Sequence, residues 1–255
     1  MAGRGWAVIV IAAIALAGAA PSARASDMVL STTPWPPYVG PTLPEHGATG
    51  AVVAAALRAA GRTLSPLYRG AVPVEDGVAA DDEVDGIFPV YATRARERAC
   101  LMSSQIGSSP LGLAERADAP LAWSRLEDLS AYTVGVVRYY ANSDSFDRLV
   151  NRGVIKVVRA ETDTENLANL IAGTVDAAII DRNVLEWLLT RDPALREDAA
   201  LVRFHPRPVA ERPLYICFRT DDRGRRARDA LEAGLGRIDA PLITAEWFRR
   251  HMASY

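Results

Sequence analysis

The sequence has few of the residues that build metal sites and nucleophilic active sites. It contains three histidines and two cysteines, His46, His205, His251, Cys100 and Cys217. Their spacings do not match metal-ligand pairs, and there is no Cys-x-x-Cys, no Gly-x-Ser-x-Gly and no glycine-rich phosphate loop. The sequence therefore gives no signal of an enzyme built on these elements, and we expect neither a metal nor a cofactor.

Long apolar runs are also lacking, except at the N-terminus. A short basic start is followed by the uncharged apolar residues 7–20 and by Ala23-x-Ala25, a small-x-small cleavage site. This pattern predicts a secretory signal peptide over residues 1–25, because the apolar core is too short to span a bilayer comfortably. An uncleaved anchor is the alternative. We expect an exported, soluble mature protein.

Lysine is almost absent, with arginine in its place. Lys156 is the one lysine, a bias that we attribute to a GC-rich coding sequence. The formal charge is −2, and residues 1–25 carry two arginines and no acid, so the remainder has a charge of about −4. A mildly acidic chain without a basic block argues against nucleic acid as the main partner.

The two cysteines leave two readings open. Cys100 and Cys217 both lie in apolar, strand-like segments, "ACLM" and "LYICF". An oxidising compartment would allow a disulfide between them, whereas two buried free thiols fit the same pattern.

Segments with strand and helix patterns alternate along the chain. Strands are predicted at residues 28–32, 84–90, 132–137, 154–158, 175–180 and 212–220. Helices are predicted at residues 49–61, 143–153, 162–174, 182–191, 222–238 and 243–252. This alternation predicts an α/β fold with largely parallel sheets. The serine-rich segment at residues 102–110 is interpreted as a loop.

Four segments, in order and spacing, carry a resemblance that covers nearly the whole mature chain. They are "STTPWPPYVGPTLPEHGATGAVVAAALRAAG", "DGIFPVYATRARERACLMSS", "VGVVRYYANSDSFD" and "ENLANLIAGTVDAAIID". Together they resemble the family 3 extracellular solute-binding proteins, the polar amino-acid receptors of ABC importers.

The resemblance implies a two-lobed type II periplasmic-binding-protein fold with two hinge crossings and ligand between the lobes. By this match, lobe 1 comprises residues 26–113 and 209–255, and lobe 2 comprises residues 114–208. The chain would cross near residues 110–116 and 206–213. The implied protein is a periplasmic monomer that binds a small amino-acid-like or carboxylate solute by hinge closure and delivers it to an ABC permease in the inner membrane.

Arg96 is the first candidate ligand-binding residue. The spacing Thr93-x-x-Arg96 followed by Met102-Ser103 resembles the family segment whose arginine binds the ligand's carboxylate. A guanidinium suits that task because its planar fork forms two parallel hydrogen bonds with a carboxylate. A surface arginine is the alternative, and Arg94 and Arg98 are expected on other faces.

Asp181, Trp35 and Tyr38 are further candidates. Asp181 ends the strand "VDAAII" and matches the acid that holds the ligand's ammonium, although an N-cap of the following helix is equally compatible. Trp35, in the proline-rich loop "PWPPY", matches an aromatic residue that covers the ligand. Tyr38 is a candidate too, with packing of the loop as the alternative.

Pro89, Tyr91 and Tyr140 complete the candidate set and mark departures from the family pattern. Tyr91 and Tyr140 stand where the family usually has glycine or small polar residues, and Pro89 removes a possible N–H donor. A more aromatic cleft would suit a larger, flatter or less polar solute.

We expect a transport receptor that is not an enzyme. Two other functions remain as alternatives. Periplasmic cyclohexadienyl dehydratases resemble the same family and use a cleft carboxylate, for which Asp181 and Glu211 are the available acids. An accessory protein of a periplasmic oxidation system, without import, is the third possibility.

Overall fold

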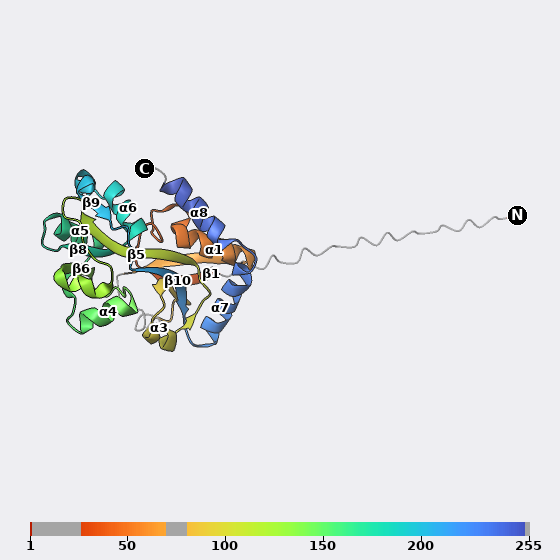
Figure 1. The fold of residues 1–255 in the computed structure, drawn as a ribbon. Coiled ribbons are helices and arrows are strands. Elements are labelled where there is room, and N and C mark those ends of the chain that lie inside the picture. Colours follow the sequence, from red (N-terminus) through yellow and green to blue (C-terminus); the bar gives the residue numbers. More distant parts are fainter. Residues whose placement is uncertain (2–26, 70–80, 253–255) are drawn as a thin grey trace.

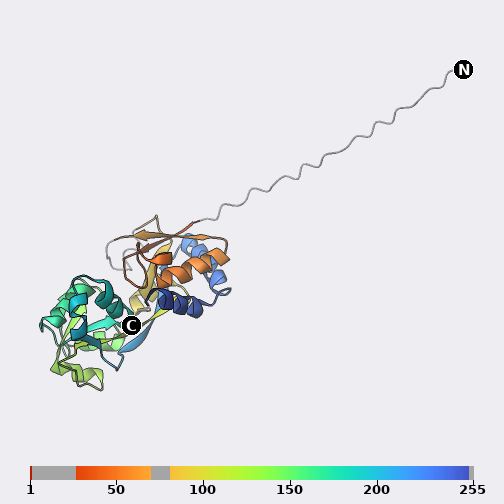
Figure 2. The ribbon, with the colours of Figure 1, turned by 90° about the horizontal axis from the view of Figure 1, so that it is seen from above.

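Two α/β bodies lie side by side and are joined by two long strands (Figures 1 and 2). A computed structural model of the protein describes Met1, residues 27–69 and residues 81–252. The predicted signal peptide, apart from Met1, lies outside the described residues. Within the described part of the chain, no helix has the length and apolar character needed to cross a membrane.

The strands of the described chain form one mixed sheet. Their order is β2-β1-β3-β10-β5-β8-β6-β7, with β4 added to β10 and β9 added to β5. Strands β1, β2 and β3 are parallel to one another, as are β6, β7 and β8. Each parallel set lies in one body, and the segments that follow β1, β3 and β6 line a common cavity.

The first body contains the N-terminal strands and the two C-terminal helices. Helices α1 and α7 pack so closely that a Cβ atom at Gly234 would overlap the backbone oxygen of Ala56. The elements of this body are β1 (Asp27–Thr32), a 3-10 turn (Pro44–His46), α1 (Ala48–Ala59), β2 (Thr63–Tyr68), β3 (Gly86–Tyr91), α3 (Arg94–Ala99), β4 (Leu101–Met102), α7 (Asp222–Leu235) and α8 (Ala240–His251).

The second body is formed by the middle of the chain. Its helices start at side-chain caps that the sequence supplies: Ser143, Thr162 and Asp181 each accept a hydrogen bond from a backbone N–H three residues later. Its elements are a 3-10 turn (Leu126–Ala131), β6 (Thr133–Val137), α4 (Asp144–Asn151), β7 (Lys156–Ala160), α5 (Asp163–Ile171), β8 (Ala177–Asp181), α6 (Arg182–Arg191), a 3-10 turn (Arg196–Leu201) and β9 (Val202–Phe204).

Strands β5 (Gly107–Arg116) and β10 (Ala210–Phe218) connect the two bodies. They pair antiparallel, from Ala210 opposite Leu111 to Leu214 opposite Gly107. Beyond this pairing, β5 joins β8 of the second body and β10 joins β3 of the first. The lobe boundaries at residues 113/114 and 208/209 stay a prediction, because the sheet continues through both strands without a break.

The α/β class is confirmed, and most predicted elements are present within a few residues of their expected bounds. The exception is the segment at residues 102–110, which is not a continuous loop, because β5 begins at Gly107. Strand β2 and helix α3 were not predicted. Cys100 and Cys217 form a disulfide with their Cα atoms 5.2 Å apart. Of the two alternatives for these residues, the structure therefore has the disulfide and not the two free thiols.

Candidate functional site

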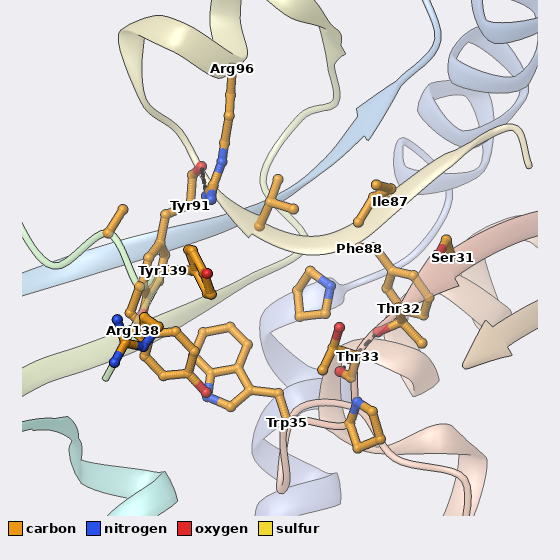
Figure 3. A pocket seen from close by; sticks show the side chains of 15 residues that line it. Ser31, Thr32, Thr33, Trp35, Ile87, Phe88, Tyr91, Arg96, Arg138 and Tyr139 are labelled. Atoms are coloured by element: carbon orange, nitrogen blue, oxygen red, sulfur yellow. Dashed lines mark hydrogen bonds between the residues drawn. The ribbon is translucent and has the colours of Figure 1, made fainter. Parts of the chain in front are cut away.

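A cavity of about 150 Å³ lies where the carboxyl ends of β1, β3 and β6 converge (Figure 3). It is lined by residues 31–35, 87–91 and 138–141 and by Arg96, and we call it the arginine cavity. The first two runs belong to the first body, and residues 138–141 follow β6 of the second. The cavity therefore lies between the bodies, at the edge where open α/β sheets bind ligands.

Arg96 reaches the cavity from helix α3, whose start is fixed locally. Thr93 caps this helix by accepting a hydrogen bond from the Arg96 backbone N–H at 3.2 Å. The Arg96 side chain then extends from the helix toward the end of β3 (Figure 3), where Nη1 donates to the Tyr91 carbonyl at 2.9 Å. Arg94 and Arg98 are exposed, so the middle arginine of the run is the one placed on the cavity wall.

Three aromatic rings form one wall of the arginine cavity. The ring centroids of Trp35 and Tyr91 lie 5.5 Å apart in an edge-to-face arrangement, and those of Trp35 and Tyr140 lie 6.4 Å apart. The edge-to-face pair of Trp35 and Tyr91 is favourable beyond the area that it buries. Because Trp35 belongs to the first body and Tyr140 to the second, the wall extends across the cleft.

Tyr91 is held at its hydroxyl and by a cation stacked on its ring. Its hydroxyl lies 2.6 Å from the Ser109 hydroxyl, and the Arg212 guanidinium stacks on its ring at 4.6 Å. Since Ser109 donates its own proton to Asp181, Tyr91 is the donor to Ser109. Burial raises the pKa of Tyr91, which keeps the phenol protonated for that bond.

Asp181 is the centre of a hydrogen-bond network that is internal to the protein. Its Oδ1 accepts from the Val184 backbone N–H at 2.9 Å, which caps helix α6. Its Oδ2 accepts from the Tyr38 hydroxyl at 2.7 Å and from the Ser109 hydroxyl. The residue is 4% exposed. The carboxylate therefore already has three protein donors.

Tyr38 joins the two bodies through this network. It is 1% exposed, its ring packs edge-on against Phe248 of α8, and Asn183 donates to its hydroxyl at 2.8 Å. Burial, followed by the neighbouring Asp181 charge, raises the pKa of Tyr38 well above its ordinary value. Tyr38 therefore remains a neutral phenol that donates to Asp181.

Asp163 and Asp181 line a second, smaller space of about 10 Å³, which we call the aspartate hollow. Its volume is that of about one water molecule. Burial raises the pKa of Asp163 to about 7, while the hydrogen bond from Tyr140 at 3.2 Å acts in the opposite direction. Burial likewise raises the pKa of Asp181 to about 6. Trp35, Tyr91, Tyr140 and Ala141 line both spaces.

Six of the seven predicted site residues line at least one of these two spaces. Five of them line the arginine cavity: Trp35, Pro89, Tyr91, Arg96 and Tyr140. Asp181 lines the aspartate hollow, and its capping role is present as well. Tyr38 lines neither space and makes the loop-packing contacts that were its alternative.

Sequence reasoning missed several polar residues of the site. Thr32 ends β1 and Thr33 follows it. Arg138 follows β6, and Asp163 opens the helix after β7. A signal was present for Thr32, Thr33 and Arg138, since each stands at the carboxyl end of a predicted strand or directly after it. Asp163 stands near the start of the predicted helix at residues 162–174. Ser109 had no such signal, because it lies inside a segment interpreted as a loop.

Among residues 27–69 and 81–252, no group of three or more His, Cys, Asp or Glu side chains is arranged to hold a metal ion. The arginine cavity instead combines a guanidinium, hydroxyl groups and aromatic rings. Such a lining can bind an anion that has a flat or apolar portion.

The chain matches no protein-family model and no curated protein. Solved structures share its fold at low sequence identity. The GluR0 ligand-binding core from Nostoc punctiforme in complex with L-glutamate has a TM-score of 0.68 and 18% identity, over 88% of this chain and 98% of that one. A histidine kinase sensor domain with similarity to periplasmic binding proteins has a TM-score of 0.72 and 19% identity, over 88% and 96%.

An ancestral arginine-binding protein bound to arginine has a TM-score of 0.69 and 14% identity, over 91% of this chain and 100% of that one. At these identities the comparisons establish the fold and nothing finer. The predicted fold is confirmed: the chain has the two-lobed, type II periplasmic-binding-protein-like α/β fold.

Proposed function

We propose that this protein is a receptor that binds a small carboxylate-bearing or amino-acid-like solute between its two lobes. The observation that carries the proposal is the position of Arg96 on the wall of the arginine cavity, at the carboxyl ends of β1, β3 and β6. A guanidinium in a partly enclosed site binds a carboxylate more strongly than it would in water.

The similar structures support this proposal through their ligands. The GluR0 core is in complex with L-glutamate, and the ancestral protein is bound to arginine. Both ligands carry a carboxylate. The shared fold supports the proposal that this chain, too, binds a carboxylate-bearing ligand, in the cavity where Arg96 and the aromatic wall lie.

We propose that binding works by hinge closure. Arg96 and Trp35 come from the first body, whereas Tyr140 comes from the second, so a ligand that touches all three stabilises the closed arrangement. A ligand shifts the population toward the closed form only by its greater affinity for that form. Strands β5 and β10 are where the hinge would bend, because they connect the lobes.

We further propose an exported, periplasmic monomer that presents its closed form to an ABC permease in the inner membrane. The predicted signal peptide and the fold support this assignment. Co-purification of an inner-membrane ABC permease with the protein, in the presence but not the absence of ligand, would support it, and capture of no permease in either condition would contradict it.

Binding itself is tested with protein from Ser26 onward, unfolded in denaturant without reductant and refolded to remove carried ligand. Isothermal calorimetry with small carboxylates and amino acids should show binding that Arg96→Ala weakens. Binding that is unchanged in Arg96→Ala would remove Arg96 from the site and contradict the proposal.

A dehydratase-like enzyme is the second candidate, and one observation favours it. The pKa of Asp163 is raised to about 7, which suits a general acid at neutral pH. Asp163 and Asp181, however, line the aspartate hollow and not the arginine cavity, where we place the ligand. We therefore propose that the protein is not an enzyme. Turnover of prephenate or arogenate that is lost in Asp163→Asn would reverse this assignment.

A further inference from the structure

The second body contributes one short turn to the arginine cavity. Among the described residues that line the cavity, only residues 138–141, which follow β6, come from this body, and we call them the β6 turn. A hydrogen bond of 3.3 Å from the Tyr140 N–H to the Val137 carbonyl closes the turn. Within the described chain, contacts between the second body and a ligand in this cavity therefore come from the β6 turn.

Two neighbouring tyrosines of the β6 turn are used differently by the protein. The ring of Tyr140 packs against Trp35, and its hydroxyl donates to Asp163 at 3.2 Å. Tyr139, in contrast, is 71% exposed. Its hydroxyl makes no hydrogen bond, and its ring makes no ring–ring contact, with the residues that the structure describes. The Tyr139 side chain is therefore available to a ligand.

The backbone of Tyr139 is held in an unfavourable conformation. Its φ angle is 68°, in the left-handed region that bulky residues rarely adopt. The other described non-glycine residues with a positive φ are Glu45 and His46, which follow one another in a single 3-10 turn. Glycine or asparagine at position 139 would adopt this conformation at a lower cost in free energy.

Contacts of the Tyr139 side chain within the described protein do not offset this cost. Backbone strain of this kind persists where it positions a side chain for binding or catalysis. The strained conformation places the Tyr139 side chain among those that line the arginine cavity (Figure 3). The strain and the exposed ring together indicate a residue that is kept for its contact with a ligand.

From these observations we propose that Tyr139 contacts the ring of an aromatic carboxylate and selects such ligands over carboxylates that have no ring. The inference rests on the proposed function and narrows its ligand class. Tyr139 adds a further ring to the wall formed by Trp35, Tyr91 and Tyr140. The cavity of about 150 Å³ resembles in size the engineered cavities that hold one benzene molecule.

The contact also connects ligand binding to closure of the lobes. Because the Tyr139 side chain is largely exposed, a flat ligand that packs against it removes apolar surface of both partners from water. Trp35 belongs to the first body and Tyr139 to the second, so a ligand ring that touches both stabilises the closed arrangement.

The first test compares matched ligands that differ in the ring. Benzoate is compared with acetate, 3-phenylpropanoate with propanoate and L-phenylalanine with L-alanine. Each is titrated by calorimetry into the stripped, refolded wild-type protein. We expect the ring-bearing member of at least one pair to bind about tenfold or more tighter than its partner, because ring burial adds to the free energy of binding.

Variants of Tyr139 test whether this residue carries the preference. Tyr139→Asn removes the ring and tolerates the left-handed φ, and it should weaken the ring-bearing ligand about fivefold or more while changing its ring-free partner less than about twofold. Tyr139→Phe keeps the ring without the hydroxyl, so it should recover most of the wild-type affinity. Without ligand, Tyr139→Asn should melt at the same temperature as the wild type or higher, because the strain is relieved.

The outcomes separate the inference from the function on which it rests. Ring-bearing ligands that bind Tyr139→Asn as tightly as the wild type would overturn the inference and leave the receptor function standing. Ring-free acids that bind the wild type as tightly as their partners would do the same. Tyr139→Phe with as large a loss as Tyr139→Asn, or a lower melting temperature of Tyr139→Asn without ligand, would also contradict the inference. Absence of binding by every ligand would contradict the receptor function itself, and the inference with it.

Discussion

The hydroxyl of Tyr38, in the first body, donates a hydrogen bond of 2.7 Å to Oδ2 of Asp181, at the end of β8 in the second body. The two residues are 143 positions apart in the chain. The family resemblance assigns Asp181 to the binding of a ligand ammonium, but this hydrogen bond already occupies one of its oxygens. The bond also links the two bodies. The first prediction follows from this bond.

Tyr38→Phe should lower the free energy of unfolding by about 1–3 kcal/mol, because buried Asp181 and half-buried Asn183 each lose a hydrogen-bond partner. Chemical denaturation monitored by fluorescence measures this change. Tyr68→Phe is the control, since the hydroxyl of that half-buried tyrosine makes one long contact of 3.4 Å to His46. Equal losses in the two variants would show that the Tyr38 network is not stabilising.

Arg96→Ala should weaken carboxylate binding by about 2–5 kcal/mol, as expected when one partner of a desolvated charge pair is removed. Calorimetric titration of the tightest-binding acid gives the value. Arg94→Ala and Arg98→Ala are matched controls in the same helix, with exposed side chains outside the arginine cavity. If either control weakens binding as much as Arg96→Ala, the effect comes from overall charge and not from a contact.

Stability should depend on pH through Asp163. With a pKa of about 7 in the folded protein, against an ordinary value of 3.8, this carboxyl keeps its proton in the folded state at pH values where the unfolded chain has lost it. Its contribution to stability therefore decreases as pH rises from about 4 to about 7. Asp181, with a pKa of about 6, contributes in the same direction.

Asp163→Asn isolates that contribution, because asparagine can still accept the Tyr140 hydrogen bond without carrying a charge. We expect the variant to melt at a higher temperature than the wild type at pH 8, with the difference shrinking toward pH 4. Asp163 also opens helix α5, where a negative charge is favourable. A variant that melts lower at pH 8 would show that this helix-end effect outweighs the cost of burial.

The disulfide between Cys100 and Cys217 should contribute about 2–5 kcal/mol to stability, because it joins residues separated by 117 positions and constrains the unfolded chain. Denaturation of the double variant Cys100→Ala, Cys217→Ala, compared with the wild type with and without reductant, tests this value. Agreement between the variant and the reduced wild type is expected. A reduced protein as stable as the oxidised one would contradict the prediction.

Much of the fold could be predicted because its signals are local. The apolar strand patterns, the helix starts near residues 143 and 162 and the Asp181 cap are properties of short segments, and the structure has them close to where they were expected. Arg96 was identified by the resemblance of the segment Thr93-x-x-Arg96 to the family pattern, whereas the short helix that carries it was not predicted.

The remaining features depend on contacts between distant segments. Residues 107–110 are glycine, serine and proline, which disfavour strands, but pairing with β10 makes them part of β5. This strand buries Ser109 completely and gives it to Asp181. The hydrogen-bond chain from Tyr91 through Ser109 to Asp181 likewise requires three distant segments to meet, so no local pattern predicts it.

The central claim is that the arginine cavity binds a small carboxylate through Arg96. Its most direct test is the thermal unfolding of stripped, refolded wild-type protein and Arg96→Ala against the panel of amino-free acids and amino acids. A ligand at 100 times its dissociation constant should add about 2.7 kcal/mol of stability to the wild type and much less to the variant. Equal stabilisation of both proteins, or of neither by any ligand in the panel, would contradict the account.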